Sequence, residues 1–178
     1  MTQPRPTPAE IERAIRNIPD FPKPGIQFKD ITPVLADARL FSGAIDLLTE
    51  NHQPGTVDAV VGIDARGFIF AAAAATKLHA GFVPVRKKGK LPYQAYEQDY
   101  ALEYGTATVA IHVDALKPGS RVLLIDDLLA TGGTSGAAAA LVQRLGAKIL
   151  EISFLIELSF LHGREKLKGY PVRSLVVF

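Results

Sequence analysis

The stretch VLLIDDLLATGGT, from Val122 to Thr134, decides the fold of this chain. Val122–Ile125 form a continuous apolar run, which is typical of a parallel strand buried on both faces. Asp126 and Asp127 follow at the end of the run, and a glycine- and threonine-rich turn leads into a helix that we expect over Ala137–Leu145. A strand, a turn and a helix in this order predict an α/β fold with a ligand site at the carboxyl end of the strand.

The turn offers the chemistry of an anion site. Thr131–Thr134 supply main-chain N–H groups and two hydroxyls at the positive end of a helix dipole, which suits a phosphate. The carboxylate pair before them can accept the O–H groups of a sugar diol, so the segment predicts a site for a phosphorylated ribose. The alternative is a solvated turn with a capping aspartate. The phosphate-binding patterns GxxxxGK[ST] and GxGxxG do not occur in the sequence.

Composition predicts one soluble domain over residues 1–178, since 48% of the residues are apolar and 21% are charged. A net charge of +2 gives no reason to expect a nucleic acid or a membrane as partner. There is no cysteine, which excludes disulfides and thiolate chemistry and fits a cytoplasmic location. The N-terminus lacks the apolar stretch of a signal peptide, and the apolar run Gly67–Ala75 is too short to span a bilayer. The four histidines have no metal-ligand spacing.

Strands and helices alternate along most of the chain. A capping box at Thr7 and Glu10 predicts a first helix with Ile11, Ala14, Ile15 and Ile18 on one face. The remaining expected elements are an extended piece (26–32), helices (40–48, 67–78 and a short 162–167), strands (57–63, 82–85, 106–113, 149–156 and 174–178) and a long polar loop after residue 85. This order predicts an α/β fold with a mostly parallel central sheet flanked by helices.

Ligands of parallel sheets bind past the carboxyl ends of the strands. The residues at those places include acids, bases and the phosphate-suited turn: Asp64, Ala65, Arg66, Arg86, Lys87, Lys88, Asp126, Asp127, Glu157 and Leu158. A basic run such as Arg86–Lys90 is, taken alone, more often a solvated turn. Its place after a strand favours a role in an anion site.

Six segments, in order, resemble the type I phosphoribosyltransferases, and within that family the enzymes that act on adenine. They are FPKPGIQFKDITPVL (21–35), GIDARGFIFA (62–71), VRKKGKLP (85–92), LEYG (102–105), VLLIDDLLATGGT (122–134) and IELSFLHGREKL (156–167). The resemblance implies the type I phosphoribosyltransferase fold with a small N-terminal hood. It also implies purine salvage: adenine and 5-phosphoribosyl 1-pyrophosphate give AMP and pyrophosphate, with Mg²⁺ held mainly by substrate and water. A homodimer is implied too.

The resemblance assigns roles around the phosphorylated sugar. The 5′-phosphate is implied to lie on Ala130, Thr131, Gly132, Gly133 and Thr134, and the ribose hydroxyls on Asp126 and Asp127. Pyrophosphate is implied to bind Asp64, Ala65, Arg66, Arg86, Lys87 and Lys90, often with a cis peptide before Ala65. Many relatives carry serine where this chain has Ala65, so only main-chain contacts carry over there.

The resemblance also places the base. Residues 1–34 are implied to form a base-binding hood, in which Phe28 stacks on adenine with Leu158 on its other face, while main-chain groups of Gln27 and Lys29 read the base edge. Glu103 is the implied acid or base near adenine N7. A mobile lid over 91–101, with Tyr104 closing over the substrate, is implied to exclude water.

Three other functions compete with this one. An enzyme of the same fold could act on hypoxanthine, guanine, xanthine or orotate, although Phe28, Glu103 and Leu158 favour adenine. A non-catalytic regulator could keep the phosphoribosyl pyrophosphate site and bind RNA or a protein. The presence of Glu103 and of the basic cluster Arg86–Lys90 argues against it. A flavodoxin-like domain that uses its acids for a metal would not explain the TGGT turn.

Overall fold

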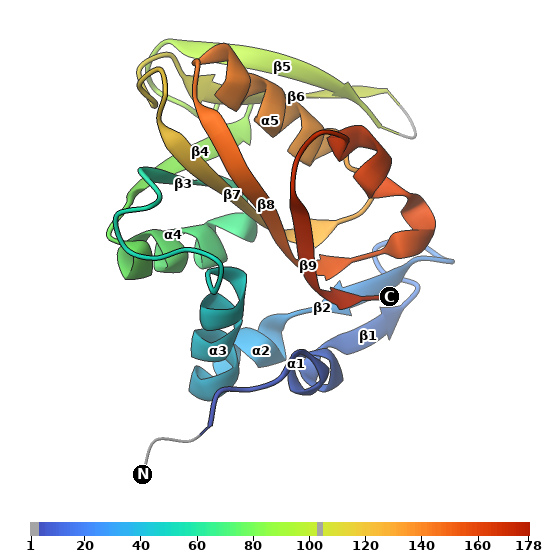
Figure 1. Ribbon diagram of the computed structural model, residues 1–178. Helices are drawn as coiled ribbons and strands as arrows, with labels where there is room; N and C mark the ends of the chain where they lie inside the picture. Colours follow the sequence, from blue (N-terminus) through green and yellow to red (C-terminus); the bar gives the residue numbers. More distant parts are fainter. Residues whose placement is uncertain (1–3, 103–104) are drawn as a thin grey trace. The chain divides into compact units, whose positions relative to one another are not determined.

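The computed structural model describes residues 4–102 and 105–178, and the chain divides into two compact units, Met1–Leu47 and Leu48–Phe178. We call them the N-terminal and the C-terminal unit. Each unit holds a β-sheet of its own (Figure 1). The elements of the C-terminal unit are β3 (Ala59–Ile63), α4 (Gly67–Leu78), β4 (Gly81–Lys87), β5 (Ala95–Ala101), β6 (Thr106–His112), β7 (Arg121–Leu129), α5 (Gly133–Arg144), β8 (Lys148–Glu157), the 3₁₀ turns η1 (Ser159–Leu161) and η2 (Gly163–Leu167), and β9 (Val172–Val177).

The sheet of the C-terminal unit confirms the predicted fold class. Its strand order is β5-β6-β4-β3-β7-β8-β9, and the five strands from β4 to β9 in this order run parallel. Only β6 and β5, at one edge, pair antiparallel. Val122, Leu123, Leu124 and Ile125 of the central strand β7 are all fully buried. That is the burial expected of a strand covered on both faces.

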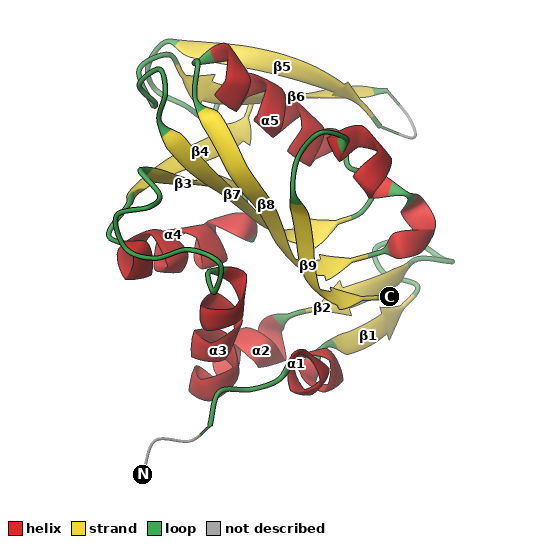
Figure 2. Ribbon diagram, in the orientation of Figure 1, coloured by secondary structure: helices red, strands yellow, loops and turns green. Residues whose placement is uncertain are grey.

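Helices α4 and α5 cover opposite faces of this sheet (Figure 2). Gly62 of β3 leaves room for α4, because a methyl group at its position would lie 2.6 Å from Ala71 Cβ. The preceding residue, Val61, packs in the core cluster that includes Ala138 and Leu141 of α5. Since successive strand residues face opposite sides of a sheet, β3 contacts one helix through each face.

The elements of the N-terminal unit are α1 (Pro8–Ala14), β1 (Arg16–Pro19), β2 (Gln27–Asp30), α2 (Thr32–Ala36) and α3 (Ala38–Leu48). The predicted capping box is present at the start of α1. The expectation that Ile15 and Ile18 continue that helix was wrong, because the chain turns extended at Ile15 and Ile18 pairs with Phe28 in an antiparallel ribbon. Strand pairing overrides helical periodicity here. The extended piece expected over 26–32 is strand β2, which ends at Asp30, and Pro33 lies in the first turn of α2.

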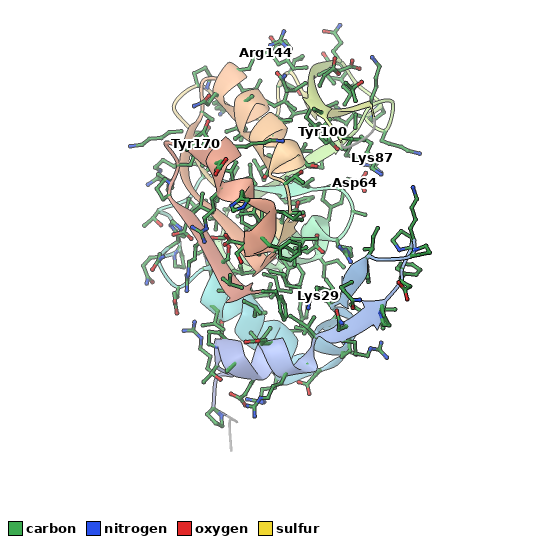
Figure 3. The ribbon with its side chains drawn as sticks, turned by 90° about the vertical axis from the view of Figure 1, so that its right-hand side faces the viewer. Lys29, Asp64, Lys87, Tyr100, Arg144 and Tyr170 are labelled. Carbon is green, nitrogen blue, oxygen red and sulfur yellow. The ribbon has the colours of Figure 1, made fainter. Side chains whose placement is uncertain are left out.

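The prediction of a long polar loop after residue 85 was wrong for Ala95–Ala101, the residues that make up most of the predicted lid. This segment is strand β5, which pairs with β6 along its length. Its side chains alternate, and Tyr96 and Tyr100 pack against the core cluster that includes α5. The Arg144 guanidinium also lies 3.9 Å from the centre of the Tyr96 ring (Figure 3). Whether residues 91–101 move as a lid stays a prediction.

No helix within residues 4–102 and 105–178 is both long and apolar enough to cross a membrane.

Candidate functional site

Loops that follow the parallel strands β3, β4 and β7 gather at one edge of the large sheet. The Asp64 main chain still pairs with β4, since its N–H donates to the Val85 carbonyl at 2.9 Å. Arg86 Nε donates to Asp64 Oδ2 at 3.0 Å, and Arg86 Nη1 donates to the Lys90 carbonyl at 3.0 Å. The structure therefore brings together three of the residues predicted to hold pyrophosphate.

Lys87 ends β4 and is exposed on the same side of the unit as Asp64 (Figure 3). The exposed turn after it closes with a hydrogen bond from the Lys90 N–H to the Lys87 carbonyl, at 3.2 Å. Lys88, by contrast, is paired with Glu97 of β5 at 2.7 Å. Lys87 and Lys90 thus present their charges to solvent beside the Asp64–Arg86 pair, where an anionic group can reach them.

The loop between β3 and α4 packs against the end of β7. Asp64–Ala65 is a cis peptide bond, as the resemblance implied. Arg66, the N-cap residue of α4, forms an ion pair with Asp127 in which Nη2 and Oδ2 lie 2.7 Å apart. Gly67 follows, and a methyl group there would lie only 2.5 Å from Asp126 Oδ1. The resemblance implied that Gly67 ends the pyrophosphate loop, but its part in letting this loop approach the carboxylate pair was not predicted.

Asp126 and Asp127 lie inside β7, which continues to Leu129, rather than just after the strand as expected. Pairing with β8 extends through Leu129, so the strand outlasts its apolar run. Burial, and next the negative charge of Asp127, raise the pKa of Asp126 well above its ordinary value. Burial also raises the pKa of Asp127, and the Arg66 guanidinium opposes that rise. A buried acid pair with one cation suits a site that receives hydroxyl donors or further positive charge.

Because their pKa values are raised in the fold, the two carboxylates make stability depend on pH. The folded protein holds these protons more tightly than the unfolded chain, so this contribution to the unfolding free energy decreases as the pH rises from the unfolded pKa to above the folded one. We expect Asp126→Asn to increase the unfolding free energy at pH 8 by more than the about 0.5 kcal/mol typical of surface substitutions.

The gain from Asp126→Asn should become small near pH 4, where the acid is protonated in the folded protein and about half protonated in the unfolded chain. Urea titrations of wild type and variant at pH 4 and pH 8 test this. Asp114→Asn serves as the control, because the Asp114 side chain is exposed. An equal effect of Asp126→Asn at both pH values would contradict the prediction.

The turn Ala130–Thr134, which we call the phosphate loop, lines a small pocket. Helix α5 begins at Gly133, four residues earlier than expected, with Gly132 as its N-cap residue at φ +76°. An early start adds the unpaired N–H groups of the first helical turn to the loop. The pocket measures about 70 Å³ and is lined by Asp126, Leu128, Ala130, Thr131, Gly132, Gly133, Thr134 and Ser135. All five predicted phosphate-binding residues and one of the two carboxylates thus line the same pocket.

The predicted base-binding residues fall in both units. In the N-terminal unit, Phe28 packs edge-on against Phe21, with ring centroids 5.1 Å apart. Both rings line an open pocket of about 200 Å³ together with Ile18 and Asp30. Gln27 and Lys29 flank Phe28 on β2, which pairs with β1 on one side. A row of main-chain groups of β2 therefore faces away from β1.

Leu158 lies in the C-terminal unit, half-buried after β8, and its N–H donates to the Leu129 carbonyl at 2.9 Å. The sandwich of Phe28 and Leu158 around a base stays a prediction. Glu103 and Tyr104, the predicted acid or base and the lid residue, lie outside the described residues.

Carboxylates do not form a larger metal-binding group at this edge. Among the residues that the structure describes, no three His, Cys, Asp or Glu side chains gather in a way that could hold a metal ion. Asp126 at the pocket, and Asp127 beside it in β7, offer carboxylate oxygens to a hard cation.

The sequence analysis also missed Gly163. A methyl group there would overlap with the Ala130 carbonyl oxygen and lie 2.8 Å from Leu129 Cδ1. A methyl group on Gly132 would in turn overlap with the Gly163 carbonyl oxygen. The two glycines therefore let η2 lie directly against the phosphate loop. The signal was the IELSFLHGREKL segment, which carried the resemblance but in which only Leu158 had a role assigned.

Comparison with known proteins places these features in a family. Residues 31–176 match the model of the phosphoribosyl transferase domain. The chain is 60% identical, over 91% of its length and 92% of the relative, to adenine phosphoribosyltransferase of Acidothermus cellulolyticus. The crystal structure of adenine phosphoribosyltransferase from Rhodothermus marinus superposes with a TM-score of 0.92, at 51% identity over 96% of this chain and 98% of that one.

The Saccharomyces cerevisiae adenine phosphoribosyltransferase, crystallised with an imino-altritol bisphosphate and adenine, gives a TM-score of 0.89 at 41% identity, over 94% of this chain and 97% of that one.

Proposed function

This chain belongs to the phosphoribosyl transferase family, among its adenine phosphoribosyltransferases, and we propose on that premise how its residues act. It is a purine salvage enzyme that transfers the 5-phosphoribosyl group from phosphoribosyl pyrophosphate to adenine, giving AMP and pyrophosphate. The observation that carries the assignment is the 60% identity over nearly the whole of a relative with this activity.

We infer that the phosphate loop takes the 5′-phosphate. Support comes from the pocket that all five loop residues line, at the start of α5, where main-chain N–H groups are unpaired. Asp126 lines the same pocket, so it and Asp127 are the residues we assign to the ribose hydroxyls. A fixed negative charge beside the sugar also favours the positive charge that develops at the anomeric carbon as the glycosidic bond breaks.

Pyrophosphate, as leaving group, needs positive charge on the other side of the ribose. We assign this role to Arg66, Arg86, Lys87 and Lys90, together with main-chain groups of Asp64 and Ala65. Arg66 and Arg86 are held in position by Asp127 and Asp64. A guanidinium carries five N–H donors, which suits recognition of a polyanion such as pyrophosphate.

Mg²⁺ fits this donor set as a partner of the substrate rather than as a resident ion. A hard cation prefers oxygen ligands, and the pyrophosphate, water and the carboxylates of Asp126 or Asp127 would supply them. When bound, it would neutralise part of the charge on the leaving pyrophosphate.

We propose that adenine stacks on Phe28, opposite Leu158, and that main-chain groups beside Gln27 and Lys29 read its edge. The half-buried ring of Phe28, which lines a pocket of about 200 Å³ together with Phe21, supports this assignment. Adenine presents an amine donor beside a ring acceptor, whereas hypoxanthine and guanine reverse that order, so fixed main-chain partners would reject them. Glu103 would exchange a proton or a hydrogen bond with the base.

We also propose a cytoplasmic homodimer. Ile69 of α4 and Phe82 of β4 are 40% and 38% exposed, and Phe82 packs edge-on against Phe68 at 5.5 Å. Exposed large apolar side chains on the neighbouring elements α4 and β4 favour a protein partner. A particle of only 19.1 kDa in sedimentation equilibrium, at the concentrations used for activity assays, would rule the dimer out. The absence of cysteine fits a reducing compartment, which cell fractionation tests.

One assay tests the proposed function. The protein is mixed with Mg²⁺, phosphoribosyl pyrophosphate and, separately, adenine, hypoxanthine, guanine, xanthine or orotate, and nucleotide formation is followed. We expect AMP from adenine, at least about a hundredfold slower reaction with the other bases, and loss of most activity when Mg²⁺ is chelated. Hypoxanthine reacting as fast as adenine would contradict the base assignment. No reaction with any base would favour a non-catalytic regulator.

A further inference from the structure

The segment HGREKL (162–167) plays no part in the function argued above, although it belongs to the six stretches that resemble the family. Its Gly163 lies directly against the phosphate loop at Ala130 and Gly132. Arg164 holds the segment from the other side, since its Nε and Nη2 donate to the buried Glu157 carboxylate at 2.8 and 2.7 Å. The segment is thus fixed beside the loop by two independent contacts.

Lys166 extends this contact along the first turn of α5. Its carbonyl oxygen lies 3.6 Å, and its Cβ 3.9 Å, from where a methyl group on Gly136 would be. Its Nζ lies 3.8 Å from the corresponding position on Gly133. Residues three apart share one face of a helix, so the lysine stem follows this face toward the helix N-terminus and its ammonium ends there. Gly133 itself lines the 70 Å³ pocket of the phosphate loop.

Lys166 and the N-terminal end of α5 bring positive charge close together. The N-terminal end of a helix carries partial positive charge, which repels a nearby cation. Across residues 4–102 and 105–178, the Lys166 side chain has no hydrogen-bond or ion-pair partner. The ammonium, the helix dipole and the loop N–H groups therefore all offer positive charge at one place.

We propose that Lys166 is a further phosphate-binding residue, whose ammonium contacts the 5′-phosphate of phosphoribosyl pyrophosphate and of AMP. The inference rests on the proposed function, because it takes the anion of the phosphate loop to be that group. An ammonium forms strong, charge-assisted hydrogen bonds with phosphate oxygens. Gly133 and Gly136, which carry no side chains, open the path along which the lysine reaches the pocket.

The test compares Lys166→Gln, which removes the charge but keeps most of the length, with Lys166→Arg and with Lys168→Gln, an exposed lysine two residues along the chain. Binding of AMP, ribose 5-phosphate and adenosine is measured by calorimetry. We expect Lys166→Gln to raise the Kd of both phosphorylated ligands about tenfold and to leave adenosine unchanged. Lys166→Arg should recover most of the loss, and Lys168→Gln should match the wild type within about twofold.

Unchanged AMP and ribose 5-phosphate affinity in Lys166→Gln would overturn the inference. So would an equal loss of AMP and adenosine affinity, or a loss matched by Lys168→Gln. The two proposals can fail separately. If the wild type makes no nucleotide but Lys166→Gln still weakens ribose 5-phosphate binding, only the proposed function is wrong. If the wild type turns over normally and Lys166→Gln binds ribose 5-phosphate and AMP as the wild type does, only the assignment of Lys166 is wrong.

Discussion

Replacing Gly163 by alanine should lower kcat/KM for phosphoribosyl pyrophosphate about a hundredfold. The new methyl group would overlap with the Ala130 carbonyl oxygen and lie 3.1 Å from the Gly132 nitrogen. Both atoms are main-chain atoms of the phosphate loop, so the overlap is relieved only if the loop moves. A displacement of about 1 Å at a positioning element can cost about a hundredfold in rate. The strained contact should also lower the unfolding free energy by about 1–3 kcal/mol.

Initial rates at varied phosphoribosyl pyrophosphate and calorimetric binding of AMP measure the effect of Gly163→Ala. Gly81→Ala is the matched control, because a methyl group there lies 3.7 Å from the Asp58 carbonyl oxygen, an ordinary contact, at the start of β4. Normal kinetics in Gly163→Ala, in a protein that melts like the wild type, would mean that η2 does not shape the phosphate loop.

The sequence predicted the sheet well where one physical signal dominates. Continuous apolar runs marked β3, β7 and β8, and the helix expected over Gly67–Leu78 is observed with those bounds. Prediction failed where pairing with a distant segment decides the structure. The polar residues of β5 form a strand because β6 offers a partner and because Tyr96 and Tyr100 can pack against the core that includes α5. Nothing local in that segment specifies the partner.

The site was predictable in its residue types but not in its close contacts. Strand ends pointed to Asp64, Arg86 and the phosphate loop because parallel strands place such ends at one edge. The glycines that allow the loops to meet were missed. Gly67 matters because of Asp126, which lies far away in the sequence, and Gly163 matters because of Ala130. The role of such a glycine can be recognised only when its neighbours in space are known.

Replacing Glu103 by glutamine should lower kcat by about a hundredfold to ten-thousandfold, the usual contribution of a positioned acid or base. Glutamine keeps the size and hydrogen-bonding capacity of the side chain but cannot exchange a proton. Adenine must lose a proton when its N9 attacks the sugar, and the proposed carboxyl near N7 stabilises the charge that moves through the ring. Because the substrates would still be held by the phosphate loop, the basic cluster and Phe28, we expect both KM values to change less than about threefold.

Steady-state rates with adenine and phosphoribosyl pyrophosphate, taken across the pH range, separate a role in proton transfer from a role in binding. The limb of the kcat profile that belongs to Glu103 should disappear in Glu103→Gln. Glu97→Gln is the matched control, since Glu97 is an exposed glutamate of β5 whose ion pair with Lys88 contributes at most about 1 kcal/mol. Weaker binding of both substrates by Glu103→Gln, with kcat and its pH profile unchanged, would make Glu103 a binding residue and leave the proton to another group. The 9-position proton of adenine would then pass to another acceptor, such as an oxygen of the pyrophosphate that the proposed site holds beside the ribose.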